Sequence, residues 1–335
     1  MTQESTAIRS PVKMVKIRTG RINKNFYGYI FVAPFILAFL LFGLYPIVYT
    51  FYLSMTDATL MSKTRHFVDI QNFSALFADK FFAQSVGNTW LIWTCNFIPQ
   101  LAIAMLLSVW FTNVRLKLKM VGFWRTIFYL PNLLMPATIA VLFFNFISFY
   151  GPLNQILVRI GVLPEAFMFV QDPTSMQTVV VFVQWWMWFG STIIVLMAGM
   201  TSISPSYYES AMVDGARSGQ MFWKITLPLL KPVLLYTLVT SLVGGMQMFD
   251  IPYMITDGRG SPNGSIMTMN VLMYMKFSSS KGYIGAAAAV GVMIFLITAV
   301  VAIVFLVLLR NKKDGVPEEN ERKLIMQRHR KGRVS

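Results

Sequence analysis

The chain is poor in the side chains that bind metals or form covalent cross-links. Among its 335 residues there is one cysteine, Cys95, and there are two histidines, His66 and His329. A single cysteine excludes an intrachain disulfide and a metal site built from thiolates. The two histidines are far apart in sequence and lack the spacing of metal ligands. The sequence therefore predicts neither a disulfide framework nor a metal site.

Charge is also scarce, since only 13% of the residues are charged whereas 56% are hydrophobic. Several apolar runs are long enough to cross about 30 Å of hydrocarbon as helices of roughly 20 residues. Proline is tolerated inside such runs, because neighbouring helices satisfy the carbonyls that it leaves unpaired. The sequence predicts an all-α integral membrane protein with six transmembrane helices, at residues 29–50, 86–111, 123–147, 177–199, 233–255 and 284–309.

Positive charge gathers in alternate loops of this arrangement. Segments 1–28, 112–125, 200–232 and 310–335 together contain 22 of the 29 Lys and Arg residues. Lys and Arg near the ends of spans accumulate on the cytoplasmic side, so both termini are predicted to be cytoplasmic. The net charge of +15 is then explained by topology, and nucleic-acid binding is not expected.

The loops are too short to form a separate soluble domain. We therefore expect one six-helix membrane domain over residues 29–309, flanked by a basic N-terminal arm, 1–28, and a basic tail, 310–335. Basic residues of this kind are attracted to anionic membrane lipid. The first span is too long for a signal-peptide core and has no small-residue cleavage site after it, so it is expected to stay as an anchor.

Three further absences bear on function. No span has an ionisable residue at its centre, the nearest being Asp250, which argues against an ion-coupled carrier or channel. There is no convergent set of His, Asp and Glu residues within a span, so no catalytic residue is predicted. There is also no phosphate-binding loop of the Gly-x-x-x-x-Gly-Lys-Ser/Thr type. If the chain takes part in driven transport, the energy must come from another subunit.

A polar island, residues about 201–232, separates the fourth and fifth spans. Ser206 and Glu209 have the spacing of a capping box, which predicts a short helix starting there. Asp214-Gly215 is the expected end of that helix, because glycine readily adopts the left-handed conformation.

A second short helix is predicted near residues 217–226, and it should stop or bend at Pro228 and Pro232. A helix, a sharp turn and a helix outside the membrane could carry force between a soluble partner and the spans. On spacing alone, a plain connection between two spans explains the segment equally well.

Ten residues of this island are spaced as in a known motif: Glu209, Ala211, Asp214, Gly215, Ala216, Phe222, Ile225, Leu227, Pro228 and Pro232. The segment resembles the E-A-A-x-x-D-G-A…F-x-x-I-x-L-P-x-x-x-P loop of ABC importer permeases, with Ser210 as the one small-for-small departure. The resemblance implies a coupling helix that seats in a groove of a cytoplasmic ATPase. The residues implied in this role are Glu209, Ala211, Asp214, Gly215, Ala216, Leu227 and Pro228.

Shorter fragments extend the resemblance over nearly the whole chain, at residues 34–38, 45–46, 88–89, 125–136, 151–154, 249–250 and 282–287. In their order they are similar to the carbohydrate branch of the family, the maltose-type and multiple-sugar permeases. The outer loop at 256–262 departs from the family's Thr-x-Gly-Gly-Pro run. The resemblance implies the type I ABC importer permease fold, in which ATP-driven closure of the ATPases rocks the membrane subunits between inward-open and outward-open states.

The same resemblance implies a set of partners. These are a second permease subunit, giving a heterodimer, two cytoplasmic ABC ATPase subunits and an extracytoplasmic solute-binding protein. ATP and Mg²⁺ would be bound by the ATPase subunits, with no cofactor in this chain. The implied location is the bacterial cytoplasmic membrane.

A sugar site needs hydrogen-bonding groups for hydroxyls and flat apolar surface for C–H faces. In the fourth span, Gln184, Trp188 and Ser191 recur on one helical face, with Trp185 beside them. In the fifth span, Gly244 and Gly245 allow close approach of a helix or a ligand, and Gln247 and Asp250 lie one turn apart. By resemblance these two spans contribute to a central solute pathway. Interfacial tryptophans and a glutamine that bonds another helix are the alternative explanations.

The expected function is therefore import of a sugar or oligosaccharide. A permease for glycerol phosphate or a polyol is the alternative, and its pocket should add a cation for the phosphate. No basic residue lies near Gln184 or Gln247 in sequence, which favours a neutral sugar.

Overall fold

The computed structural model describes residues 24–113, 118–256 and 258–309. The basic arm and tail predicted at the two ends lie almost wholly outside these residues. The described residues are mostly helical, and six of their helical segments are long and apolar enough to cross a membrane. These are Gly28–Ser54, Lys80–Thr112, Pro136–Arg159, Pro173–Thr201, Ser218–Met254 and Ile284–Leu308.

The contacts within the chain divide it into two units, residues 1–49 and 50–335. The first contains α1 (Lys24–Phe39), which passes through a π-helical turn, η1 (Leu40–Leu44), into α2 (Tyr45–Ser54). Its large apolar side chains are exposed, Phe31 and Phe42 among them. An exposed apolar helix of this kind is stable in hydrocarbon, which agrees with the predicted first span.

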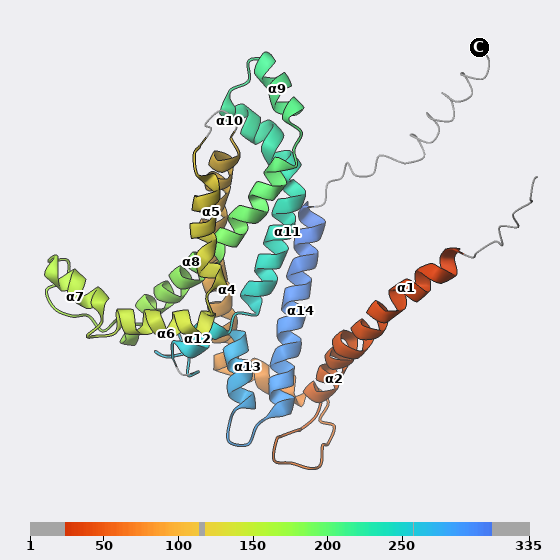
Figure 1. Cartoon of the computed structure of the whole chain (residues 1–335). Helices are drawn as coiled ribbons and strands as arrows, with labels where there is room; N and C mark the ends of the chain where they lie inside the picture. Colours follow the sequence, from red (N-terminus) through yellow and green to blue (C-terminus); the bar gives the residue numbers. More distant parts are fainter. Residues whose placement is uncertain (1–23, 114–117, 257, 310–335) are drawn as a thin grey trace, which may run out of the picture. The chain divides into compact units, whose positions relative to one another are not determined.

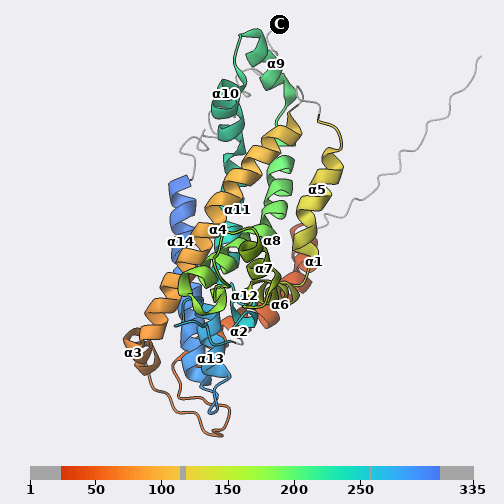
Figure 2. The same cartoon turned by 90° about the vertical axis from the view of Figure 1, so that its left-hand side faces the viewer.

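Residues 50–335 contain the remaining helices (Figure 1). Their bounds are α3 (Gln71–Ala78), α4 (Lys80–Thr112), α5 (Val121–Tyr129), η2 (Leu130–Leu133), α6 (Pro136–Ile147), α7 (Pro152–Arg159), η3 (Phe169–Gln171), α8 (Pro173–Thr201), α9 (Pro205–Val213), α10 (Ser218–Met221), η4 (Phe222–Thr226), α11 (Leu227–Met246), α12 (Asp250–Met254), α13 (Met269–Phe277) and α14 (Ile284–Leu309). The long helices α4, α8, α11 and α14 pack against one another. Figures 1 and 2 both show α9 and α10 at one end of these helices and α13 at the other.

Aspartate side chains begin two of the long helices. Asp79 accepts a hydrogen bond from the backbone N–H of Phe81, and Asp172 accepts one from Ser175, so each satisfies a donor that the first helical turn leaves free. Where α8 crosses α5, a side chain at Gly190 would overlap the backbone carbonyl of Phe128. Glycine therefore permits this close approach.

Buried apolar residues form three clusters that fix the long helices. One joins α4, α11, α13 and α14, and includes Trp93, Leu242 and Val290. A second joins α6, α8 and α12, and a third joins α4, α8 and α11 nearer to α9. The space between the second and third clusters, where α4, α8 and α11 converge, contains polar residues instead.

Two predicted spans differ from single helices. The third, 123–147, is α5 followed by the 3₁₀ turn η2 and by α6, with an extended residue, Met135, before Pro136. The residue before a proline is disfavoured in the helical conformation, which explains the break there. The fifth, 233–255, is broken between α11 and α12, where Phe249 has φ −135° and ψ −56°.

Candidate functional site

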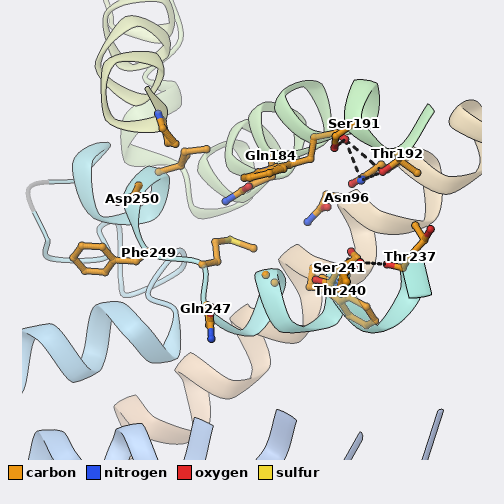
Figure 3. A pocket seen from close by; sticks show the side chains of 18 of the residues that line it. Asn96, Gln184, Ser191, Thr192, Thr237, Thr240, Ser241, Gln247, Phe249 and Asp250 are labelled. Carbon is orange, nitrogen blue, oxygen red and sulfur yellow. Dashed lines mark hydrogen bonds between the residues drawn. The ribbon is translucent and has the colours of Figure 1, made fainter. Parts of the chain in front are cut away.

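A cavity of about 420 Å³ lies between α4, α8, α11 and α12. Its polar lining comes from all four helices and the break before α12, and comprises Asn96, Gln100, Gln184, Ser191, Thr192, Tyr236, Thr237, Thr240, Ser241, Gln247 and Asp250. Aromatic faces are added by Trp93, Trp188 and Phe249. Figure 3 shows Gln184 on α8 and Asn96 on α4 with their amides directed into the space between the helices.

The α8 face is arranged as the sequence predicts. Gln184, Trp188 and Ser191 all line the cavity. Gln184 is only 8% exposed, and its side chain makes no hydrogen bond within the described chain. A buried amide without a protein partner is costly in a membrane protein. Its donor and acceptor are therefore available to a polar solute or to water in the cavity.

Trp185 differs from its neighbours, because it does not line the cavity. Its ring stacks on Phe189 with centroids 5.2 Å apart, within the cluster that joins α8 to α4. Its indole Nε1 is buried and has no hydrogen-bond partner in the part of the chain that is described. Trp185 was predicted for the pathway, but it faces away from this cavity, since one helical position turns a side chain by about 100° from its neighbour.

The contribution of α4 was not predicted. Gln100 Nε2 donates to Thr192 Oγ1 at 2.7 Å, which joins α4 to α8 at the cavity wall. Asn96 Nδ2 donates to the carbonyl of Ile92 at 2.7 Å, so its Oδ1 remains as an acceptor. The sequence does indicate this contribution, because Asn96 and Gln100 are two amides four residues apart, which places both on one helical face.

Hydroxyl groups on α11 complete the polar wall. Thr237 and Thr240 donate to carbonyls of their own helix at 2.8 Å each, which leaves their lone pairs as acceptors.

Farther along α11, a side chain at Gly245 would overlap the indole of Trp93, whereas one at Gly244 would meet nothing within 4 Å. Trp93 Nε1 donates to the carbonyl of Ser241 at 3.0 Å, so Gly245 is the position that lets α4 and α11 meet.

Gln247 and Asp250 both line the cavity, but they are not one turn apart on a continuous helix. Gln247 ends α11, and Asp250 begins α12 after the break at Phe249. Both are exposed, and Figure 3 shows Gln247 directed away from Gln184 and Asn96. Asp250 is the one charged residue among the described residues that line the cavity.

The polar island forms the predicted helix, turn and helix, with a different start. Ser204 precedes α9, Pro205 opens it, and Ser206 Oγ lies 2.9 Å from Ser204 Oγ. The predicted capping box of Ser206 and Glu209 is therefore absent from the described chain. Proline is favoured in the first turn of a helix, because the missing N–H would have no partner there.

The end of α9 is a Schellman motif built from the motif residues. Gly215 has φ +77°, the N–H of Ala216 donates to the carbonyl of Ala211 at 2.9 Å, and that of Gly215 donates to Met212 at 3.1 Å. Asp214 is the last residue before this turn. Gly215 thus has a structural reason to be glycine, because its positive φ is disfavoured for other residues.

After the turn, one helix runs from α10 through the π-helical turn η4 into α11. Of the two predicted alternatives, a stop or a bend at Pro228 and Pro232, the stop is wrong, because the helix continues past both. Pro228 lies in the first turn of α11 directly after η4, and Pro232 lies inside α11. Proline interrupts regular helical hydrogen bonding, and an adjacent π turn absorbs this without ending the helix. Leu227 is half-buried, whereas Glu209 and Pro228 are exposed.

No group of three or more His, Cys, Asp and Glu residues that could hold a metal ion is found among the residues that the structure describes. Close to α9 there is a second cavity of about 380 Å³, lined mainly by apolar residues of α4, α8, α9 and η4.

Comparison with known proteins gives a consistent result. Residues 88–313 match the family described as binding-protein-dependent transport system inner membrane component. The chain is 32% identical over 297 residues to the lactose transport system permease protein of Rhizobium radiobacter, covering 87% of this chain and 97% of that protein. It is 30% identical over 291 residues to the arabinooligosaccharides transport system permease protein of Bacillus subtilis (strain 168), covering 85% and 88% respectively.

Among solved structures, the chain is similar to a bacterial ABC transporter involved in the import of the acidic polysaccharide alginate. The TM-score is 0.68 at 24% sequence identity, covering 87% of this chain and 98% of that chain. This likeness supports the predicted all-α fold with six membrane-crossing helices.

Proposed function

This chain belongs to the family of inner membrane components of binding-protein-dependent transport systems, and from that premise we propose that it is the permease subunit of an ATP-driven importer for a neutral sugar or oligosaccharide. The observation that carries the proposal is the cavity between α4, α8 and α11. It joins amides and hydroxyls to the aromatic faces of Trp93 and Trp188, the combination that sugar recognition requires. The names of the two relatives, which are permeases for lactose and for arabinooligosaccharides, support the same class of solute.

The charge of the cavity favours a neutral solute over glycerol phosphate. No Lys, Arg or His lies among its described lining residues, and Asp250 would repel a phosphate. Charged groups are strongly attracted or repelled where water is partly excluded. A polyol without a phosphate fits the same lining and is separated from a sugar only by the uptake assay.

The energy comes, in this proposal, from two ATPase subunits that hold ATP and Mg²⁺. These subunits would contact a coupling segment that runs from α9 into the first turn of α11. Its residues with this proposed role are Glu209, Ala211, Asp214, Gly215, Ala216, Leu227 and Pro228. A second permease subunit would close the open side of the cavity, and an extracytoplasmic solute-binding protein would deliver the sugar. With this orientation both termini are cytoplasmic, as the distribution of Lys and Arg indicates.

The first experiment is to tag the chain, purify it gently from its native membrane and identify the proteins that accompany it by mass spectrometry. A second permease and an ATPase with a phosphate-binding loop are expected. The purified assembly is then placed in liposomes and tested for uptake of labelled lactose, maltose, trehalose and arabinotriose, with glycerol 3-phosphate and glycerol as comparisons. ATP-independent uptake by the chain alone would overturn the proposal in favour of a carrier.

Gly215 tests the coupling segment separately from the cavity. Replacing Gly215 by Val should release the ATPase or abolish uptake, because a β-branched residue resists the positive φ at a cost of roughly 1–2 kcal/mol. Gly215→Asn is the matched control, since asparagine tolerates this conformation. A side chain meets nothing within 4 Å there, so steric overlap is not a cause. Normal ATPase association and uptake in Gly215→Val would remove the coupling assignment.

A further inference from the structure

The coupling segment is attached to the cavity by a single run of helix. From Ser218 through η4 to Met246 the chain stays helical, and Thr237, Thr240 and Ser241 on this run line the cavity. A displacement of α10 is therefore carried along a stiff element to the cavity wall. By contrast α9, where Glu209 and Ala211 lie, reaches this run through the turn at Gly215.

A helix pair joined only by a short turn can hinge about it. Glycine at a positive φ offers little resistance of its own to such hinging. A second attachment, away from the turn, would make α9 and the following helix move together. The structure has a hydrogen bond in that place: Tyr208 Oη lies 3.0 Å from Thr226 Oγ1.

Thr226 is placed for this contact by the π turn. Thr237 and Thr240 on the same run donate to the carbonyl four residues earlier, as Thr298 does to Ile294 on α14. Thr226 Oγ1 instead lies 3.4 Å from the carbonyl of Met221, five residues earlier. This is the spacing of a π-helix, which recurs at functional sites. If Thr226 donates to Met221, its oxygen accepts from Tyr208, so both hydroxyl groups are used.

The contact is also partly buried. Thr226 is 7% exposed, Tyr208 is half-buried, and both line the second cavity, beside Met221 and Phe222. A hydrogen bond is stronger in such surroundings than at the surface. Leaving one of these hydroxyls without its partner there costs free energy.

We propose that the Tyr208–Thr226 hydrogen bond pins α9 to α11, so that the two act as one rigid lever between the ATPase and the solute cavity. Tyr208 and Thr226 are positioning residues in this scheme, since neither touches the solute. The inference rests on the proposed function and adds to it the route by which force reaches α11. Without the pin, α9 follows the ATPase while α11 lags, and ATP is hydrolysed with less sugar imported.

The test compares ATP hydrolysed per sugar imported in the complete reconstituted complex, with whichever of the four labelled sugars above the wild type imports. Tyr208→Phe and Thr226→Val each remove one hydroxyl with little change of shape. Each should raise the ATP-to-sugar ratio roughly fivefold, the effect of losing about one hydrogen bond. The double variant should be no worse than the single variants, and Thr226→Ser, which keeps a hydroxyl, should behave as the wild type.

Two matched controls share the chemistry but not the position. Tyr150→Phe changes a tyrosine outside the coupling segment, whose side chain is 84% exposed, and Thr298→Val removes a hydroxyl that bonds only within α14. Both should keep the wild-type ratio. Unchanged ratios in Tyr208→Phe and Thr226→Val would overturn the pin while leaving the importer intact. Loss of assembly in both, with both controls assembling, would also overturn it, because the bond would then serve folding.

A second measurement needs no sugar. Spin labels on Val213→Cys and Leu229→Cys, in a Cys95→Ser background, report the distance between α9 and α11 in the complex. With the pin, this distance should be the same without nucleotide and after trapping with ATP and vanadate. In Tyr208→Phe it should change or broaden on trapping, and an unchanged narrow distribution in that variant would contradict the proposal. If the wild-type complex imports none of the four sugars, the proposed function is contradicted. The distance measurement still tests whether the Tyr208–Thr226 hydrogen bond holds α9 to α11.

Discussion

At the scale of single residues, neighbours in sequence have separate tasks on α8. Gln184 is directed into the cavity without a hydrogen-bond partner among the described residues, whereas Trp185 is packed into the cluster between α8 and α4. Both were predicted for the pathway, because span-wide periodicity does not say which face of a helix meets its neighbours. The packing of α8 against α4 decides this, and it depends on residues some 80 positions away.

This separation predicts opposite phenotypes. Gln184→Ala should raise the KM for the imported sugar three- to tenfold, since about one hydrogen bond is lost, and should leave thermal stability unchanged. Trp185→Phe should lower the unfolding free energy by about 1–2 kcal/mol, because it leaves a small cavity, and should leave KM unchanged. Uptake kinetics and thermal unfolding of the complex measure the two. Equal effects of both variants on KM would show that Trp185 also contacts solute.

A second pair of adjacent residues, Gly244 and Gly245, gives a matched test of packing. Gly245→Ala should destabilise the protein by about 1–3 kcal/mol, because the new methyl group overlaps the indole of Trp93 and displaces it from Ser241. Gly244→Ala should be neutral or slightly stabilising, since its methyl group meets nothing and alanine favours a helix. Thermal unfolding distinguishes them, and equal melting temperatures would contradict the close approach of α4 and α11.

At the scale of elements, the long helices could be predicted from the sequence, but their interruptions could not. Hydropathy placed α4, α8 and α14 within a few residues of their bounds at one end or both. The break between α11 and α12 needs a distant partner: Thr268 Oγ1 donates to the carbonyl of Met248 at 2.8 Å, satisfying a carbonyl that the helix end leaves free. Thr268 is fully buried and caps the start of α13, so no residue close to the break in sequence indicates where α11 ends.

The loop before α13 is also held by partners that are distant in sequence. Asn88 Nδ2 donates to the carbonyls of Gly264 and Met267, and Gln177 Nε2 donates to that of Ser265. Amides from α4 and α8 therefore hold the loop that leads into α13. Their presence near the ends of two spans was visible in the sequence, but the partners were not, because backbone carbonyls have no sequence signature.

One ion pair between elements carries a pH prediction. Lys276 Nζ, in the last turn of α13, lies 2.8 Å from Asp79 Oδ2 at the start of α4. Burial raises the pKa of Asp79, but the hydrogen bond from Lys276, the N–H of Phe81 and the charge of Lys276 together lower that pKa below its ordinary value. A carboxylate with a lowered pKa stabilises the folded state above its unfolded pKa, near 3.8, and loses this contribution as the pH falls through the folded pKa.

Asp79→Asn keeps a side chain that can begin α4 and removes only the charge. Because both side chains are still about a quarter exposed and water screens the pair, the loss at pH 7 should be small, about 0.5 kcal/mol. Thermal unfolding in low salt should show it, and the difference from wild type should shrink in high salt and toward pH 3. A difference that persists in high salt would indicate that packing, not charge, is responsible.

At the scale of the whole molecule, the distribution of Lys and Arg predicts which end of the helices lies on the cytoplasmic side. The helices show two ends, one with α9 and α10 and one with α13, and the sequence assigns the first to the cytoplasm (Figure 1). Val213 on α9 is 89% exposed, and Met61 in the loop between α2 and α3 is 78% exposed. Each is a suitable reporter of the side on which its loop lies.

In a Cys95→Ser background, Val213→Cys should react with a membrane-impermeant maleimide only after cells are opened, whereas Met61→Cys should react in intact cells. The physical reason is that basic loops stay on the side where they are made, so the segment with Lys224 and Lys231 remains inside. A cysteine-free chain gives the background, and detergent-solubilised protein should show both sites reacting equally. Labelling of Val213→Cys in intact cells would invert the topology, and no cytoplasmic ATPase could then reach α9.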